Sequence, residues 1–150
     1  MNTLIDPVTE VSRVIGRFRR QLRRSTGRGF DSIRLTESQS ELLWLVGRQP
    51  GISVSAAAAE LGLVANTAST LVSKLLDKGL LVRTAGQTDR RVGQLRLTEA
   101  AQQIVDTSRA TRKAALAEVL NELDGAQIES LAKGLEVLDT MTRRLQERRQ

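Results

Sequence analysis

The sequence predicts a mainly helical protein with one small β-hairpin, and three observations support this fold class. Apolar residues recur at three- and four-residue spacing in several long segments, as in helices that bury one face. Aromatic residues make up only 2% of the chain, so the core must come from Leu, Val, Ile and Ala. Two short segments of alternating polarity enclose one glycine-bounded loop. A chain of 150 residues fits one compact subunit with two lobes.

The middle of the chain predicts two helices joined by a short turn. Ser53 to Leu61 is alanine-rich, and Gly62 follows where a left-handed helix cap is usual. A second helix runs from Val64 to Lys78 and is closed by Gly79. Its apolar residues share one predicted buried stripe: Val64, Ala68, Leu71, Val72, Leu75 and Leu76.

The other face of this second helix is polar and crowded toward its N-terminal half. Its side chains are Asn66, Thr67, Ser69, Thr70, Ser73 and Lys74. Short hydrogen-bonding side chains of this kind suit a helix whose first turns meet base edges in a DNA major groove. We expect Lys74 to contact phosphate instead.

A hairpin follows the two helices directly. Its strands are expected at Leu80 to Thr84 and at Gln94 to Thr98, with a nine-residue polar loop over 85–93. The loop tip carries Asp89, Arg90 and Arg91. Helix, turn, helix and hairpin in this order predict a winged helix-turn-helix over residues 36–98.

Two helices are expected before this module. The first runs from Val8 to about Arg24, and its apolar stripe contains Val8, Val11, Ile15, Phe18 and Leu22. Its other face is basic, with Arg13, Arg17, Arg19, Arg20, Arg23 and Arg24. Three interpretations remain open for these arginines: a solvated face, pairing with acidic residues of a partner subunit, or contact with flanking DNA phosphate.

The second of these helices begins at a capping box, Thr36 to Gln39, and continues to about Arg48 before Pro50. It is apolar on most sides, so we expect it to be buried between the two lobes. Trp44 is expected in the core, with a place in a ligand pocket as the alternative.

After the hairpin, Thr98 caps a helix from Glu99 to about Leu123, and Asp124 to Gln127 forms another capping box. The last helix has a seam of heptad spacing: Ile128, Leu131, Leu135, Leu138, Thr142 and Leu145. Such a stripe must pack inside its own subunit or against a second copy. The charged C-terminal end is expected to fray. These boundaries predict N-terminal (1–35) and C-terminal (99–150) dimerisation segments around the central module.

The run from Leu71 to Arg83, then Asp89-Arg90-Arg91, then Leu95-Arg96-Leu97-Thr98 resembles the MarR family of bacterial transcriptional regulators. In that family an aspartate two residues before an arginine marks the wing, and an L-x-L-T sequence leads into the next helix. The resemblance implies a short strand at Ile52. It also implies that the first helix and the last two build a two-fold dimer, which would bind a pseudo-palindromic operator.

By the same resemblance, Arg91 inserts into the minor groove, Asp89 holds its orientation, and Arg90 lies near phosphate. The sequence departs from the family at two positions. Thr70 stands where many relatives have arginine, and Val64 stands where a helix-capping serine is common. Direct contact with guanine is therefore in doubt at Thr70, and DNA shape would supply part of the specificity.

Regulation by a small aromatic or anionic effector is also implied by the resemblance. The candidate lining residues are Phe18, Leu22, Phe30, Leu43 and Trp44. The chain has no cysteine, which excludes the thiol oxidation used by some relatives. Arginines of the first helix would hold an anion.

Composition narrows the function class. A net charge of +6 and a pI near 10.9 favour an anionic partner, and double-stranded DNA fits best. Without histidine or cysteine, a transition-metal site is not expected, and neither is a cofactor. Catalytic motifs are absent, so we do not expect an enzyme.

No signal peptide or long apolar run points to a membrane, and we expect a cytoplasmic protein. We expect a sequence-specific DNA-binding regulator that acts as a repressor. The alternative is an architectural DNA-binding protein with little operator preference and no ligand response.

Overall fold

The structure is a computed structural model that describes residues 6–26, 33–86 and 92–149. Its elements follow the chain in the order α1 (Pro7–Thr26), α2 (Glu37–Arg48), β1 (Ile52–Ser53), α3 (Val54–Leu61), α4 (Ala65–Asp77), β2 (Leu81–Ala85), β3 (Gly93–Leu97), α5 (Glu99–Asn121) and α6 (Gly125–Glu147). The mainly helical fold class with a small β wing is confirmed.

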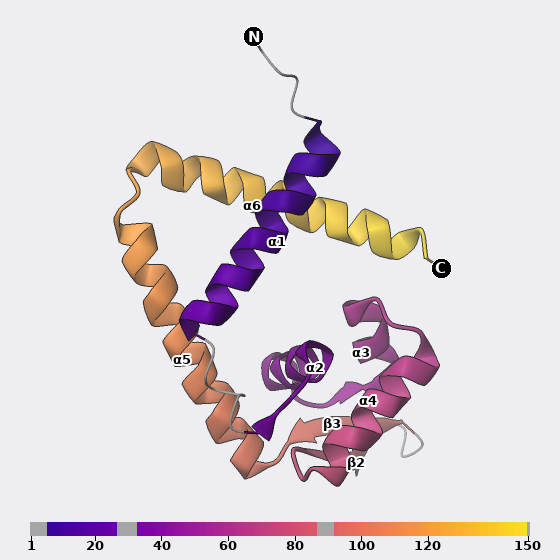
Figure 1. Cartoon of the computed structure of the whole chain (residues 1–150). Helices are drawn as coiled ribbons and strands as arrows, with labels where there is room; N and C mark the ends of the chain where they lie inside the picture. The colour runs from indigo at the N-terminus through magenta and orange to yellow at the C-terminus, as the bar shows by residue number, and fades with distance from the viewer. Residues whose placement is uncertain (1–5, 27–32, 87–91, 150) are drawn as a thin grey trace.

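The three strands form one antiparallel sheet in the order β1-β3-β2. Leu81 pairs with Leu97 and Arg83 with Leu95, while Ile52 of β1 pairs with Leu95 from the other side. The sheet packs against α2, α3 and α4 in the lower right of Figure 1. The sheet thereby fixes the hairpin beside the helix-turn-helix.

Local capping explains where most helices begin. Thr36 and Gln39 form the expected capping box at α2, and Asp124 and Gln127 form the one at α6. Gly62 caps α3 with φ 66°, in the left-handed region that favours glycine. In each case the side chain or glycine needed by the helix end is encoded within four residues of that end.

One core joins the middle of the chain to the start of α5. Its buried side chains are Leu42, Leu43, Leu45, Val46, Ala57, Val72, Leu75, Leu80, Leu81, Leu95, Ala101 and Val105. Ala101 and Val105 belong to α5, so the first turns of that helix extend the core beyond residue 98. We call this unit, residues 33–105, the winged-helix lobe.

The predicted stripe of α4 needs one correction. Ala68, Val72 and Leu75 are buried as expected, but Val64 is 70% exposed. Val64 is the N-cap residue and has an extended backbone, with φ −72° and ψ 153°. Because the helix begins only at Ala65, helical periodicity does not carry the Val64 side chain onto the buried face.

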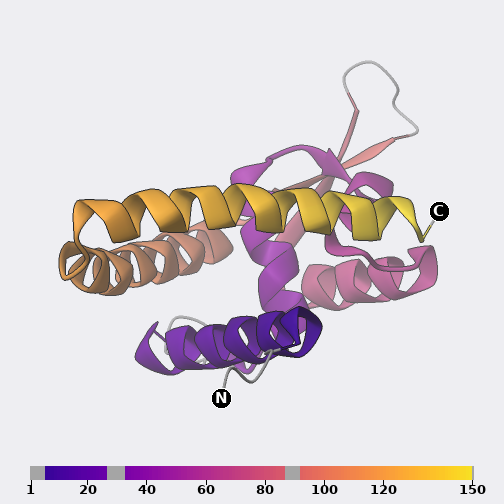
Figure 2. The same cartoon turned by 90° about the horizontal axis from the view of Figure 1, so that it is seen from above.

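The remaining helices form an open frame around this lobe. In Figure 1, α5 leads away from the lobe on the left, α6 returns across the top, and α1 lies between them. Figure 2, seen from above, separates α1 from α6, which overlap in the first view. None of the residues of α6 is buried. Within the described residues, no helix is both long enough and apolar enough to span a bilayer.

Candidate nucleic-acid interface

The polar face of α4 is presented to solvent because its other face is locked into the core. Asn66, Thr67, Ser69, Thr70, Ser73 and Lys74 are all exposed. Ala68, Val72 and Leu75 are sealed against the winged-helix lobe on the opposite side. This anchoring gives a row of hydrogen-bonding side chains on a rigid support, which is what insertion into a major groove requires.

The hydroxyl of Thr70 is already engaged within the helix. Its Oγ1 donates to the backbone carbonyl of Asn66 at 2.9 Å. Since the only hydroxyl proton is used, Thr70 can offer a neighbouring base a lone pair or its methyl group, but not a second donated hydrogen bond. A methyl group at this place suits contact with the methyl of thymine.

The hairpin supports the second part of the interface. Arg83 on β2 and Arg96 on β3 are exposed, and each lies on a strand that leads to the loop. Their register partners are Leu95 and Val82, so the two arginines occupy opposite faces of the hairpin. The predicted wing residues Asp89, Arg90 and Arg91 lie outside the described residues.

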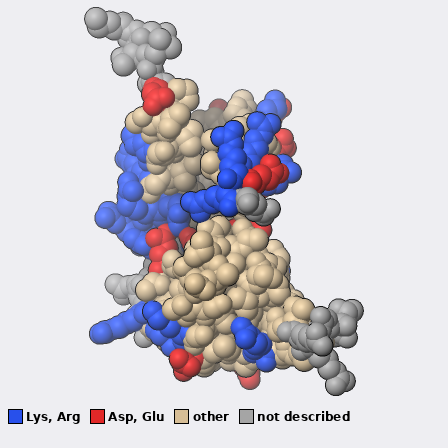
Figure 3. Space-filling model, turned by 90° about the vertical axis from the view of Figure 1, so that its right-hand side faces the viewer, with Lys and Arg blue, Asp and Glu red and all other residues tan. Residues whose placement is uncertain are grey.

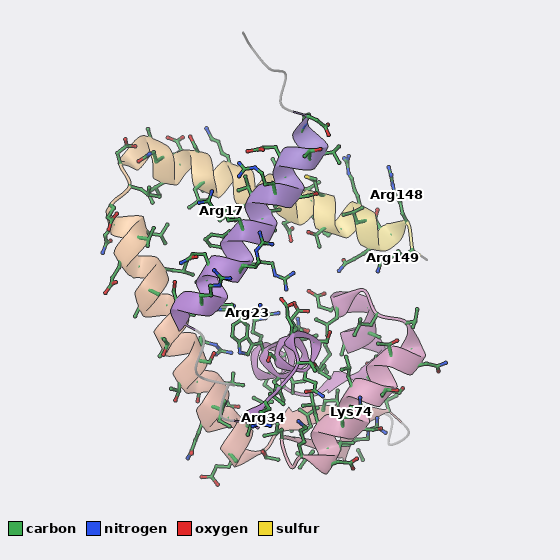
Figure 4. All side chains as sticks on the ribbon, in the orientation of Figure 1. Arg17, Arg23, Arg34, Lys74, Arg148 and Arg149 are labelled. Atoms are coloured by element: carbon green, nitrogen blue, oxygen red, sulfur yellow. The ribbon has the colours of Figure 1, made fainter. Side chains whose placement is uncertain are left out.

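Charge is distributed unevenly over the face that bears α3 and α4. In Figure 3, Lys and Arg gather over the upper half of the molecule, where the terminal helices lie. The lower half of that face is mostly neutral. Lys74, labelled in Figure 4, is the single cation of α4 itself. On this face, then, most cations lie over the terminal helices, and few lie on the half that bears α4.

Two arginines of α1 have acidic partners on α2 of the same chain. Arg19 forms ion pairs with Glu37 and with Glu41, the latter at 2.6 Å, and Arg23 lies 3.7 Å from Glu37. Glu37 and Glu41 occupy one face of α2, four residues apart. The four-residue spacing of these glutamates predicts an acidic face on α2, but it does not predict which arginine will pair with it. Pairing with acidic residues of the same chain was not among the three interpretations of the basic face.

A small hollow lies beside these ion pairs, where α1 meets α2. It encloses about 170 Å³ and is lined by Gly16, Arg19, Arg20, Arg23 and Glu37. Three of the five lining residues are cations and one is a carboxylate. Because Arg19 and Arg23 already pair with Glu37 and Glu41, the excess of positive charge at the hollow comes from Arg20.

The five candidate ligand residues are not gathered at that hollow. Phe18 is 55% exposed on α1, and Leu22 is half-buried on the same helix. Leu43 is completely buried in the winged-helix core, and Trp44 is half-buried. Phe30 lies outside the described residues. The hollow is lined instead by Gly16, by three of the α1 arginines that were expected to hold an anion, and by Glu37 of α2.

Trp44 joins α2 to α5 through a cation–π contact. The guanidinium carbon of Arg112 lies 3.3 Å from the centre of the indole ring. Burial lowers the pKa of Arg112, and the nearby charge of Arg19 lowers it further. Arg112 was not singled out in the sequence, because only the fold brings α5 against α2.

Comparison with known proteins agrees with this geometry. A model of the MarR family matches residues 35–92. No curated protein matches the sequence significantly.

Several solved structures share the fold. FabT from Streptococcus pneumoniae, solved in complex with DNA, is 22% identical, with a TM-score of 0.78 over 93% of this chain and 99% of that one. CouR from Rhodococcus jostii RHA1, bound to p-coumaroyl-CoA, is 22% identical, with a TM-score of 0.69 over 92% and 95%. A MarR family protein from Bacillus stearothermophilus is 20% identical, with a TM-score of 0.70 over 91% and 95%.

The family match covers α2, the helix-turn-helix and the start of the wing. The structural matches extend the same fold over the terminal helices. Residues 35–92 thus resemble the MarR family, and the chain as a whole shares its fold with solved structures that include a MarR family protein.

Proposed function

We propose that the protein is a sequence-specific repressor that binds a pseudo-palindromic operator as a homodimer and is released by a small anionic ligand. The observation that carries the DNA-binding part is the anchored α4, with six exposed polar residues opposite a buried face. Asn66, Thr67, Ser69, Thr70 and Ser73 would read the major groove, and Lys74 would contact phosphate. The relative solved with DNA supports this assignment.

The wing would supply the second DNA contact. Arg91 would enter the narrow minor groove of A·T-rich DNA, Asp89 would orient it, and Arg90 would lie near phosphate. Arg83 and Arg96 are exposed on the strands that lead there, and they would add phosphate contacts on the two sides of the hairpin.

The dimer proposal rests on apolar side chains that one chain leaves exposed. On α6 these include Leu131, Leu135 and Leu145, and on α1 they include Ile15 and Phe18. Exposed apolar side chains that share one stripe of a helix are typical of an interaction site. A second copy covers it with the same stripe, and two copies carry two α4 helices for two half-sites.

The effector proposal rests on the cationic hollow between α1 and α2. Its arginines would hold a carboxylate or phosphate. Phe18, Leu22, Phe30 and Trp44 remain the proposed apolar contacts outside the hollow itself, whereas the completely buried Leu43 would not reach such a ligand. A relative bound to p-coumaroyl-CoA supports an effector that is both anionic and aromatic. Release requires that this ligand bind more tightly to a dimer whose α4 helices no longer match the half-sites.

The test is a titration of the protein against DNA upstream of its own gene, with a shuffled fragment of equal length as control, across a salt series. A sequence-specific regulator should keep a large preference for the upstream fragment at physiological salt. The logarithm of affinity should fall against the logarithm of salt with a slope of about −0.9 per phosphate contact.

The second candidate function is an architectural DNA-binding protein. It is favoured by one observation, the absence of arginine from α4, since short polar side chains discriminate bases less than a bidentate arginine. Equal binding to both fragments, lost together as salt rises, would support this alternative and reject operator recognition on that DNA.

A further inference from the structure

The C-terminal end of α6 contacts the turn of the helix-turn-helix in the same chain. Gln146 Nε2 donates to the backbone carbonyl of Glu60 at 3.0 Å. The guanidinium of Arg149 donates to the backbone carbonyl of Gly62 at 2.8 Å. These contacts join residues more than 80 positions apart, and they replace the frayed end expected from the sequence.

The two accepting carbonyls lie where α3 needs partners. The last carbonyls of a helix have no donor within the helix, and its C-terminal end carries a partial negative charge. The N–H of Gly62 and that of Leu63 turn back to Ala58 and Ala59, which leaves the carbonyls of Glu60 and Gly62 facing outward. The side-chain amide of Gln146 donates to one of these carbonyls, and the guanidinium of Arg149 brings a donor and a positive charge to the other.

The turn that receives these donors leads directly into α4. Only Leu63 and Val64 separate Gly62 from Ala65, the first residue of α4. Figure 4 labels Arg149 at the end of α6, above α3 and far along α6 from its junction with α5. Since α6 buries none of its own residues, this contact ties its far end to the winged-helix lobe.

We infer that Gln146 and Arg149 are positioning residues, which couple the dimerisation helix α6 to the placement of α4. The inference rests on the proposed function, because it assigns these contacts to the spacing of two reading helices in a dimer. α6 would act as a strut: its apolar stripe faces the second copy, and its end holds the turn before α4. Loss of the strut lets α4 move relative to the dimer axis.

The first measurement is operator affinity of the Gln146→Ala/Arg149→Ala variant. We expect a loss of about tenfold, the scale of two hydrogen bonds, with an unchanged dimer in sedimentation. Arg148→Ala is the matched control, because it removes an adjacent exposed cation and leaves both contacts in place. It should show only the small loss expected for one charge. Arg149→Lys keeps a cationic donor and should recover most of the affinity.

The second measurement follows the position of α4 directly. The chain has no cysteine, so Asp77→Cys, at the exposed end of α4, accepts one spin label per chain. The label-to-label distance distribution in the free dimer should be narrow, and the double variant should broaden it. An altered distance without loss of dimer is an effect that a merely local stabilising role would not produce.

Three outcomes would overturn the inference. Unchanged operator affinity would do so, as would an unchanged distance distribution in the double variant. Dissociation of the variant into monomers would assign these residues to the dimer interface instead. If the unmodified protein shows no operator preference, the proposed function fails, while the distance measurement in the free dimer still tests the strut.

Discussion

The helices of the winged-helix lobe and helix α6 are all amphipathic, but they differ in what covers their apolar faces. Leu43, Leu45, Leu75 and Leu95 are completely buried within the lobe. On α6, Leu135 is 54% exposed and Leu145 is 63% exposed. The lobe therefore buries its own apolar residues, whereas α6 leaves its stripe exposed, and we propose that a second copy covers it. Under this proposal, the same helical period would serve folding within one chain in the lobe and association between two chains on α6.

The largest expected effect is at the stripe of α6. Leu135→Glu should convert the dimer to monomer, because each of two copies loses about 1.5–3 kcal/mol of apolar burial and gains a charge at the interface. Circular dichroism should stay unchanged, since this side chain is exposed in the single chain. Sedimentation across a dilution series measures the effect. A variant that remains dimeric at the lowest concentrations would place the interface elsewhere and remove the contrast with the lobe.

A substitution in the core of the winged-helix lobe should instead lower the free energy of unfolding. Leu75→Ala should cost about 2–5 kcal/mol in the free energy of unfolding, because it leaves a cavity in the closed core. Urea denaturation without added ligand measures the cost, because a ligand that binds the folded protein would itself raise the midpoint. Leu145→Ala is the matched control on α6 and should cost much less at concentrations where the dimer is already dissociated. Equal costs at the two positions would contradict the comparison.

The wing should affect DNA binding without affecting either core. Arg91→Ala should weaken operator binding by about 1.5–3 kcal/mol per subunit, the scale of a lost charge-assisted contact. Thermal unfolding and sedimentation should match the unmodified protein. Fluorescence anisotropy with a labelled operator measures the loss. Unchanged affinity would defeat the assignment of Arg91 to the minor groove.

A smaller effect, on base preference, is expected from a substitution on α4, the helix that we propose enters the major groove. Thr70→Ala removes the methyl group and the hydroxyl of the exposed Thr70 side chain, which we propose contact a base, while α4 keeps its buried side. Sequence preference should change by about 1 kcal/mol or more at one base pair per half-site, with little change on random DNA. A selection from randomised operators compares the two proteins. Equal losses on operator and random DNA would count against a reading role.

The smallest effect belongs to the start of α1. Asp6 accepts hydrogen bonds from the backbone N–H groups of Val8 and Thr9 and from the Thr9 hydroxyl, which lowers the pKa of Asp6 below 3.8. Its stabilisation of α1 is therefore present above pH 3.8 and is lost as the pH falls through the lower folded value. The amide shift of Thr9 should follow this titration in NMR spectra. The same transition in Asp6→Asn would assign it to another group.

Local features could be predicted from the sequence, and contacts between distant segments could not. The capping boxes at Thr36 and Asp124 and the left-handed cap at Gly62 depend on neighbours within a few residues, so their patterns were sufficient. The exposed polar residues of α4 followed from its period. The partners of Arg19 and Arg149 depend on how α1 packs against α2 and on how the end of α6 meets the end of α3, which no local pattern encodes.

The contact between Trp44 and Arg112 gives the protein a built-in optical signal. The chain has one tryptophan and no tyrosine, so its near-ultraviolet emission comes from the α2–α5 junction alone. The charge of the guanidinium acts directly on the excited indole, so we expect withdrawal of Arg112 to change the emission maximum and lifetime of Trp44. Movement of α5 against α2, on DNA binding or on loading of the arginine hollow, can therefore be timed by stopped flow in the unlabelled protein.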